Sequence, residues 1–558
     1  MRYMALFQVI TTLLLPIRSS CTPVLWESEK SVNFWYDHAL SQLDKTLAKQ
    51  VNTNLAKNII LFLGDGMGLA SVTAGRIRKG QRFGRMGENE QLHFEQFPYT
   101  GFVKTYNIDY QTPDSAGTGT AYLCGVKARF NTIGLDGHVQ TSNCTSSFGH
   151  NISCLTDWAY SAGKSVGIVT NSHITDASPT AAYGHVSTRF WQTYNPHNFR
   201  GYGAKQFREG CKDIARQLIE DNSHFHVLLG GGRQKFLPNT TKDGERLDNL
   251  NLIDKWLQLK NESKQSHKYV QTRKQLLELN PDKVDYVLGL FAPEYMHVDS
   301  EKRKYPDEPT LEEMTNVAIK ILSKNPRGYF LFVEGGLIDV MHHKTFARLA
   351  IEEVVDFDRT IEQATKQSNE NETLIIVTAD HSHTFSFGGY GYRGSDIFGY
   401  ASYYEGMNRS DIDNKTFSII SYGNGPNYAN RSSMNSIHLP RFEYPAATPL
   451  RQGSHGGEDI PVYAQGSWSH LFQGTMEQVM IAHYAAYAAC IGPLFDRQHS
   501  VCLRRHHQTE SKYGHDRSVV LLILTSFILV LIILILIILI YHLFYRQKTS
   551  TITIQPQN

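Results

Sequence analysis

Four short apolar runs, each closed by polar, glycine or acidic residues, constrain the fold of this chain most strongly. With their closing residues they cover 58–65, 165–170, 329–334 and 373–380. Continuous apolar runs of this length are typical of strands buried on both faces, and the helical patterns between them suit crossover connections. The sequence therefore predicts an α/β fold with a central, mostly parallel sheet and helices on both faces.

Three of these runs end at a carboxylate, namely Asp65, Glu334 and Asp380. In a parallel sheet the carboxyl ends of the strands meet at one edge, where ligands bind. Carboxylates gathered there repel one another unless cations lie between them. We therefore expect a cation site at that edge.

Two segments beside these strand ends add histidine. Asp339 and His343 are four residues apart, which puts both on one helical face, where they can bind zinc. Alternatively, they are a first-turn acidic residue and a surface histidine. An adjacent Asp and His after the last run offer two ligands from one rigid support, although a hydrogen-bonded core histidine gives the same pattern. This last segment and a later glycine-rich loop supply the candidates Asp380, His381, His383 and His455.

Ser115 follows Pro113 and Asp114 at the start of a predicted helix. It is either an N-terminal cap or a nucleophile whose ionised oxygen is stabilised by the helix dipole and by zinc. Arg189 has two N–H groups suited to a phosphate, although a lone arginine in a polar stretch is ordinarily a surface residue.

Charge and glycine patterns exclude other functions. The chain has 55 Lys and Arg against 53 Asp and Glu and no long basic run, which argues against a nucleic-acid partner. Residues 64–68 are not a dinucleotide fingerprint, because Leu69 stands where the third glycine is required. Residues 163–165 resemble the end of a nucleotide-binding loop, but Trp158 occupies the position of its first glycine.

The two ends of the chain indicate export and membrane attachment. Residues 1–21, with an apolar stretch from Ala5 to Ile17, are typical of a signal peptide. Residues 519–541 are apolar and long enough to cross a bilayer. Because a polar tail, 542–558, follows, we expect a retained span with an extracellular ectodomain at the cell membrane; a lipid anchor that replaces the span is the alternative.

Between these ends we expect one catalytic domain, 22–503, and a juxtamembrane stalk, 504–518. Within the domain, residues 388–452 are rich in Gly, Tyr, Ser, Asn and Pro with weak periodicity, which is typical of a loop-rich insert.

Export permits disulfides and glycosylation. Cys124 and Cys154 could equally be buried thiols. The disulfide candidates are Cys144, Cys211, Cys490 and Cys502. The acceptor sequons begin at Asn143, Asn151, Asn239, Asn261, Asn371, Asn408, Asn414 and Asn430.

Several of these motifs, taken together, closely resemble those of the animal alkaline phosphatases. The matching segments are Leu63–Gly68, Pro113–Thr118, Ala177–Pro179, Val333–Gly336, Ile338–Asp339, Thr378–His383 and His455–Asp459. The similarity extends from about residue 30 to about residue 500 and is interrupted mainly in the insert. It implies hydrolysis of phosphate monoesters to alcohol and inorganic phosphate through a phosphoserine, with two zinc ions and one magnesium ion per subunit.

The resemblance also implies individual roles. Ser115 would be the nucleophile, with Asp65, Asp380 and His381 on its zinc. The second zinc would be held by Asp339, His343 and His455, and magnesium by Asp65, Ser178 and Glu334. Arg189 would bind phosphate, and Asp114, Asp176 and His383 would support these groups. Disulfides would join Cys144 to Cys211 and Cys490 to Cys502.

Family members are homodimers, in which the segment that matches residues 388–452 forms a crown. Tyr390 matches a tyrosine that reaches the neighbouring subunit's site.

The sequence departs from its animal relatives at the metal sites. Where they carry two histidines near magnesium, it has Asp176 and Val340, so we expect tighter magnesium binding from the added carboxylate. Ala292 follows Phe291 where relatives have Glu, which argues against a peripheral calcium.

The sequence bears on three rival functions. A sulfatase would need a Cys-x-Pro-x-Arg-like nucleophile motif, which residues 113–117 lack. A phosphodiesterase of the same superfamily normally has Thr as nucleophile and lacks the magnesium ligands. A non-catalytic surface protein that retains the fold is the alternative from another class.

Overall fold

The structure, a computed structural model, describes residues 27–195, 208–404, 407, 409–428, 434–494, 502, 522 and 524–543. The predicted signal peptide, the stalk 504–518, nearly all of the tail, and the sequons at Asn408 and Asn430 lie outside these residues. The chain divides into two compact units, residues 1–492 and residues 493–558.

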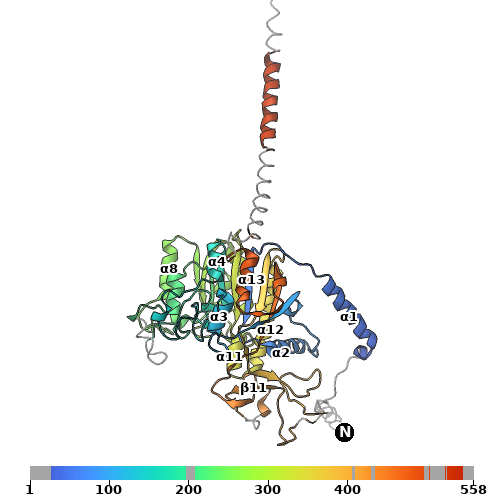
Figure 1. Cartoon of the computed structure of the whole chain (residues 1–558). Coiled ribbons are helices and arrows are strands. Elements are labelled where there is room, and N and C mark those ends of the chain that lie inside the picture. Colours follow the sequence, from blue (N-terminus) through green and yellow to red (C-terminus); the bar gives the residue numbers. More distant parts are fainter. Residues whose placement is uncertain are drawn as a thin grey trace, which may run out of the picture. The chain divides into compact units, whose positions relative to one another are not determined.

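Among the described residues, ten strands form the central sheet of the first unit (Figure 1). Seven of them run parallel to their neighbours, from β8 to β5, while β14 is antiparallel to both β8 and β2. The order across the sheet is β15 (Gly474–Glu477), β2 (Tyr99–Lys104), β14 (Ile460–Gly466), β8 (Thr373–Thr378), β1 (Asn58–Gly64), β7 (Tyr329–Gly335), β3 (Ser165–His173), β4 (Val227–Gly231), β6 (Tyr286–Leu290) and β5 (His267–Val270).

The four strands predicted from apolar runs are confirmed as β1, β3, β7 and β8. They are adjacent at the centre of the sheet, in the order β8, β1, β7, β3. All residues of β3, β7 and β8 are buried, as are six of seven in β1, because helices cover both faces. Their carboxyl ends are level, since Glu334 pairs with both Leu63 and Thr170.

Two groups of helices pack on the sheet. One consists of α2 (Leu69–Arg82), α10 (Leu311–Leu322), α11 (Leu337–His343) and α12 (Ala347–Gln367). The other consists of α3 (Ser115–Cys124), α4 (Leu155–Ser161), α5 (Ala177–Thr180) and α13 (Met480–Ala489). Further helices are α7 (Ile214–Arg216), α8 (Leu252–Glu262) and α9 (Arg273–Leu277). The predicted α/β fold with a mostly parallel sheet is therefore confirmed.

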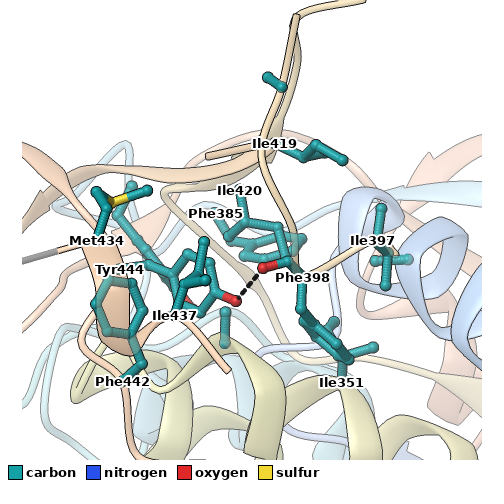
Figure 2. Packing of buried hydrophobic residues seen from close by; sticks show 14 of the residues in the cluster. Ile351, Phe385, Ile397, Phe398, Ile419, Ile420, Met434, Ile437, Phe442 and Tyr444 are labelled. Atoms are coloured by element: carbon teal, nitrogen blue, oxygen red, sulfur yellow. Dashed lines mark hydrogen bonds between the residues drawn. The ribbon is translucent and has the colours of Figure 1, made fainter. Parts of the chain in front are cut away.

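The loop-rich segment has a small sheet and core of its own. Its strands are β11 (Ile420–Gly425) and β12 (Ala446–Pro449), and β10 (Phe385–Phe387), which lies just before residue 388, pairs with β11 and completes the sheet. Figure 2 shows Phe385, Phe398, Ile420 and Met434 packed together, with Ile351 from α12 in the same cluster. Such packing fixes the segment on α2 and α12 although it has little regular structure.

Two helices expose apolar surface. No residue of α1 (Val32–Leu47) is buried, and apolar side chains recur along it at helical spacing. Among the described residues one helix, Leu524–Leu543, is long and apolar enough to cross a membrane. This C-terminal helix is compatible with a membrane anchor.

Candidate active site

The level ends of the four central strands bring the predicted ligands together. Asp65 directly follows β1, and Asp380 stands two residues after β8. Both residues are almost fully buried. Gly66 N–H donates to Asp380 Oδ1 over 2.9 Å, so backbone that leaves one strand fixes the carboxylate that follows its neighbour.

Ser115 is the first residue of α3 and is 1% exposed. The cap is Asp114, which accepts hydrogen bonds from the N–H groups of Ala116 and Gly117, so the interpretation of Ser115 as a cap is wrong. The Oγ of Ser115 lies 3.2 Å from Nε2 of His381. The serine oxygen is therefore held at the positive end of a helix and beside a candidate metal ligand.

Three histidines, His343, His381 and His455, turn Nδ1 toward a backbone carbonyl, which leaves Nε2 facing the site. Nδ1 of His343 lies 2.5 Å from the carbonyl oxygen of Gly453, and Nδ1 of His455 lies 2.8 Å from that of Pro113. His381 Nδ1 likewise faces the carbonyl oxygen of Ser382. Since Nδ1 donates to a carbonyl, Nε2 carries the lone pair that a metal requires.

Two candidate metal clusters share His381. Within each, the potential ligand atoms lie within 4.8 Å of one another. One cluster is Asp65, Asp380 and His381; the other is Asp339, His381, His383 and His455. His343 adjoins the second cluster, with Nε2 at 3.3 Å from Asp339 Oδ2 and 3.2 Å from His455 Nε2.

His383 lies closer to these ligands than its predicted supporting role suggests. Its Nε2 makes a very short contact with Asp339 Oδ1. Burial lowers the pKa of His383, and burial also lowers the pKa of His381 to about 3. Burial therefore favours the neutral form of these two imidazoles, which is the form that binds metal. At His343 the effect of burial is exceeded by the charge of Asp339 and by hydrogen bonds with Asp339 and Gly453, which raise the pKa.

Glu334 lies on the strand beside β1 and is 1% exposed. Its Oε2 accepts hydrogen bonds from the hydroxyl groups of Thr170 and Ser172, the second over 3.0 Å. Ser178, in α5, donates to Asp65 Oδ2 over 3.3 Å. Carboxylates and hydroxyls suit magnesium better than imidazole does.

Burial and mutual repulsion shift the pKa values of these carboxyl groups. Burial raises the pKa of Glu334 to about 8 and that of Asp380 to about 6. Burial, and then the charge of Asp380, raises the pKa of Asp65 well above its usual value. Asp65 Oδ1 and Asp380 Oδ2 are buried without a hydrogen-bond partner among the described residues. Cations fit these donor sets, because they would satisfy the unpaired oxygens and offset the repulsion.

Arg189 lies between two carboxylates. Its Nη2 is 3.1 Å from Asp176 Oδ1 and its Nη1 is 3.5 Å from Asp114 Oδ2. Tyr295 donates its hydroxyl to Asp176 Oδ2 over 3.1 Å. Burial favours protonation of Asp176, but the charges of Arg189 and His173, together with hydrogen bonds from Ala177 N–H and the Tyr295 hydroxyl, outweigh it and lower the pKa. Asp176 therefore faces the interior, and Arg189 balances its charge. Val340 packs beside an apolar cluster.

Several site residues were not predicted. Thr170 closes one of the apolar runs, so its place at the strand edge was a usable signal. Tyr295 and the Asn131 N–H, which donates to Asp114 Oδ1 over 3.1 Å, lie in irregular segments with no such signal.

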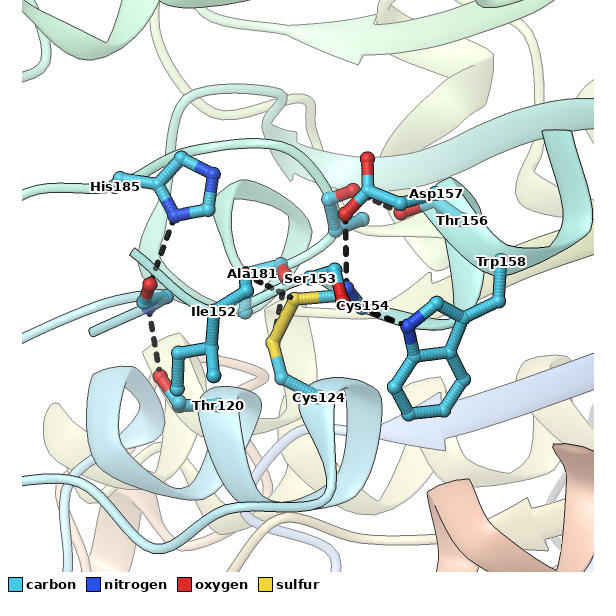
Figure 3. Close-up of a disulfide and its surroundings, with 12 residues drawn as sticks. Thr120, Cys124, Ile152, Ser153, Cys154, Thr156, Asp157, Trp158, Ala181 and His185 are labelled. Carbon is cyan, nitrogen blue, oxygen red and sulfur yellow. Dashed lines mark hydrogen bonds between the residues drawn. A yellow bond between two sulfur atoms is a disulfide. The ribbon is translucent and has the colours of Figure 1, made fainter. Parts of the chain in front are cut away.

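Two disulfides join separate segments of the chain. Cys144 is bonded to Cys211, the pair that the resemblance implies. Cys124 is bonded to Cys154, so the buried-thiol interpretation is wrong. Figure 3 shows this bond joining the last residue of α3 to the residue before α4. Cys490 and Cys502 are each disulfide-bonded as well.

Comparisons with known proteins agree with this geometry. A model of the family described as alkaline phosphatase matches residues 56–491. The chain is 45% identical over 487 residues to the tissue-nonspecific isozyme of alkaline phosphatase from Felis catus, covering 84% of this chain and 91% of that protein. It is 46% identical over 483 residues to an alkaline phosphatase from Gadus morhua, covering 84% and 98%.

Solved structures show the same fold at lower identity. The alkaline phosphatase of the Antarctic bacterium TAB5 is 22% identical with a TM-score of 0.54, over 78% of this chain and 98% of that one. The enzyme from Thermus thermophilus is 20% identical with a TM-score of 0.55, over 78% and 92%. Two TAB5 variants, with Glu or Asp in place of a histidine, have magnesium bound in the site called M3.

Proposed function

The chain belongs to the alkaline phosphatase family, and we propose that it hydrolyses phosphate monoesters through a phosphoserine formed on Ser115. Membership makes the protein a phosphatase that acts on phosphate monoesters, so the interpretation as a non-catalytic surface protein is set aside. The observation that carries the proposal is the buried Ser115 Oγ, 3.2 Å from His381 Nε2 at the start of α3.

In the proposed reaction, Ser115 Oγ attacks phosphorus in line with the leaving alcohol. Water then attacks the phosphoserine, and the two displacements together retain configuration at phosphorus. The Arg189 guanidinium and the positive end of the α3 dipole would offset the charge that gathers on the phosphoryl oxygens.

We assign zinc to the two histidine-containing sets and magnesium to the carboxylate-hydroxyl set. The first zinc set is Asp65, Asp380 and His381, and the second is Asp339, His343 and His455. The magnesium set is Asp65, Ser178 and Glu334. When bound, such ions supply Lewis-acid charge that lowers the pKa of a hydroxyl or water beside them.

Asp176 bears on the choice of magnesium. An added carboxylate near Glu334 favours a hard cation over zinc. The magnesium bound by TAB5 variants with Glu or Asp in place of a histidine supports this assignment. Because Asp176 is paired with Arg189, its effect on magnesium is smaller than that of a free carboxylate.

The test is hydrolysis of a chromogenic phosphomonoester by the purified full-length chain. We expect activity that chelator abolishes and that zinc with magnesium restores. Ser115→Ala should lower kcat by at least about 10³-fold while both zinc ions stay bound, and Ser386→Ala, on an exposed serine of β10 just before the insert, is the matched control. Radioactive phosphate trapped at acidic pH on a residue other than Ser115 would overturn the mechanism. Faster hydrolysis of phosphodiesters than of phosphomonoesters would favour the phosphodiesterase alternative.

A homodimer is proposed from exposed apolar surface. Val32, Trp35, Leu40 and Leu47 of α1 are each at least 52% exposed, and they repeat at helical spacing. A second copy of the chain is a suitable cover for such a stripe. Tyr390, on the insert, is 71% exposed and is free to reach a neighbouring subunit. Light scattering of the detergent-solubilised protein should give twice the monomer mass, and Trp35→Glu with Leu40→Glu should halve it.

Attachment through a retained span is proposed for the C-terminal helix, with the catalytic unit outside the cell. The described sequons support that side of the membrane, because Asn151, Asn239, Asn261, Asn371 and Asn414 are exposed. A phospholipase specific for glycosylphosphatidylinositol should leave the protein on intact cells. Quantitative release, with the tail absent by mass spectrometry, would establish the lipid anchor.

A further inference from the structure

A third cluster of metal-ligating side chains lies in the connection between α3 and α4. It consists of Asp136, His138 and His150, whose potential ligand atoms lie within 4.8 Å of one another. It shares no residue with the two clusters at the strand ends. Neither the fold nor the phosphatase reaction assigns it a role.

One carboxylate serves both imidazoles. Oδ1 of Asp136 lies 3.0 Å from Nδ1 of His138, and its Oδ2 lies 2.9 Å from Nδ1 of His150. The two rings stand side by side, with centroids 5.3 Å apart and planes 31° apart. Ligands of a tetrahedral zinc lie about 3.3 Å from one another, given bonds of about 2.0 Å, so small ring rotations bring these atoms to metal-binding distance.

The backbone holds the ligands in place. Leu135 and Asn151 form an antiparallel bridge, and Asp136 N–H donates to the carbonyl oxygen of His150 over 3.2 Å. Asp136 Oδ1 also accepts a hydrogen bond from His138 N–H. The loop between them is tied to a distant segment by the Cys144–Cys211 disulfide. Asp136 and His150 therefore lie on neighbouring segments that are hydrogen-bonded to each other. Such segments give the rigid support that a metal site needs.

Ion pairing alone does not explain the arrangement well. The His138 side chain is 82% exposed, and exposed ion pairs contribute between zero and about 1 kcal/mol to stability. Two imidazoles on one carboxylate are, in contrast, the donor set of many zinc sites, with a further position open to solvent. We propose that Asp136, His138 and His150 bind a divalent transition-metal ion, Zn²⁺ in the first place, at a site separate from the catalytic metals.

The bound ion would stiffen a segment that reaches the catalytic end of the molecule. A few residues before Asp136, Asn131 donates its N–H to Asp114 and accepts from Arg189 N–H over 2.9 Å. Ile133 is bridged to Val186 in the same stretch. The site is therefore structural: it fixes the connection that carries Asn131 and contacts no substrate.

The test compares zinc content in the full-length protein after equilibration with buffered free zinc and excess magnesium. We expect His138→Gln and His150→Gln each to hold one zinc ion fewer per chain than the wild type, with kcat changed less than about twofold. His138→Gln carries little risk of misfolding because its side chain is exposed. His438→Gln, on an exposed histidine of the insert outside the three clusters, is the matched control and should keep the wild-type content.

Hydrogen–deuterium exchange supplies a local readout. Zinc should slow exchange of the peptide 136–151 in the wild type and in His438→Gln, and should leave it unchanged in His138→Gln. Equal zinc content in wild type and both cluster variants, or equal loss in the His438→Gln control, would overturn the proposal. Metal content and exchange are measured without substrate, so failure here is distinguishable from failure of the phosphatase mechanism.

Discussion

Two sets of buried carboxylates in this molecule differ in whether a basic side chain pairs with them. On α12, Glu352 and Asp356 meet basic side chains of α2: Arg78 and Arg82 donate to Glu352 over 2.6 Å, and Arg82 reaches Asp356 over 2.8 Å. At the strand ends, Asp65, Glu334 and Asp380 form no ion pair with any lysine or arginine that the structure describes.

The difference separates charges that hold the fold together from charges kept for ligands. A buried carboxylate with a fixed guanidinium partner is satisfied once the chain folds. One without such a partner destabilises the fold until a cation arrives, which is tolerated at sites where function requires it. The same substitution of a carboxylate by an amide should therefore have opposite consequences in the two regions.

The largest effect is expected for Asp380→Asn. The amide oxygen can still accept from Gly66 N–H, but the charge that we assign to the first zinc site is lost. We expect kcat/KM to fall at least about 10³-fold, equivalent to several kcal/mol of charge stabilisation, with zinc content reduced. In the metal-free state the variant should be more stable than the wild type at pH 8, because one repelling charge is gone.

Differential scanning calorimetry of both proteins after chelation checks the second half of this expectation. If metal-free Asp380→Asn melted below the metal-free wild type, the strand-end carboxylates would not be the unsatisfied charges that the comparison requires.

Removing the metals should make stability depend on pH. Glu334 has a folded-state pKa raised to about 8 from 4.5, and Asp380 one raised to about 6 from 3.8. At a pH between the unfolded-state and the folded-state pKa of either group, the unfolded chain has released a proton that the folded chain keeps. The free energy of unfolding therefore falls as pH rises through this range. The apparent Tm of the metal-free protein, minus that of the metal-loaded protein, should therefore decrease from pH 5 to pH 8. A flat difference would mean that the cluster is not strained by its own charge.

Glu352→Gln should lower stability without touching catalysis. It leaves Arg78 without this partner and weakens the hold on Arg82, at a cost of about 2 kcal/mol. We expect the apparent Tm to fall by a few degrees and kcat to remain within about twofold. Glu362→Gln, on a more exposed residue of the same helix, is the control and should change neither quantity. A large loss of kcat in Glu352→Gln would erase the distinction between the two regions.

The smallest effect is expected for Tyr295→Phe. Without the tyrosine hydroxyl, Asp176 relies more on Arg189 and leaves that guanidinium less available to phosphate. The inhibition constant for inorganic phosphate should rise about threefold, in line with the loss of one hydrogen bond. Tyr160→Phe, on an exposed tyrosine, is the control. An unchanged or lower inhibition constant in Tyr295→Phe would mean that Asp176 does not compete for Arg189.

The regularly spaced parts of this molecule were accessible from the sequence. Apolar runs reveal buried parallel strands, and parallel strands place their ends at one edge, so the meeting of Asp65, Glu334 and Asp380 follows from local pattern alone. Thr170 belongs to the same logic, since it closes the run that became β3.

Contacts between irregular segments were not accessible. Tyr295 is 119 residues from Asp176, and His150 follows His138 across a loop without periodicity. No local propensity encodes such pairs, because they depend on how two segments far apart in the chain come to lie together. The Cys124–Cys154 bond is of this kind: a cysteine in the helix that begins at Ser115 meets one that precedes a different helix.

That bond has a practical meaning for anyone who makes the protein. A host that keeps its thiols reduced would deliver a chain in which α3 lacks this covalent tether and is held by packing and by hydrogen bonds such as that from Gly134 N–H to Thr120 Oγ1. Material from a bacterial cytosol should therefore differ from secreted material in specific activity even at equal purity and metal content. Yield measured by mass and yield measured by turnover would then diverge, and the gap between them would report how much of the preparation passed through an oxidising compartment.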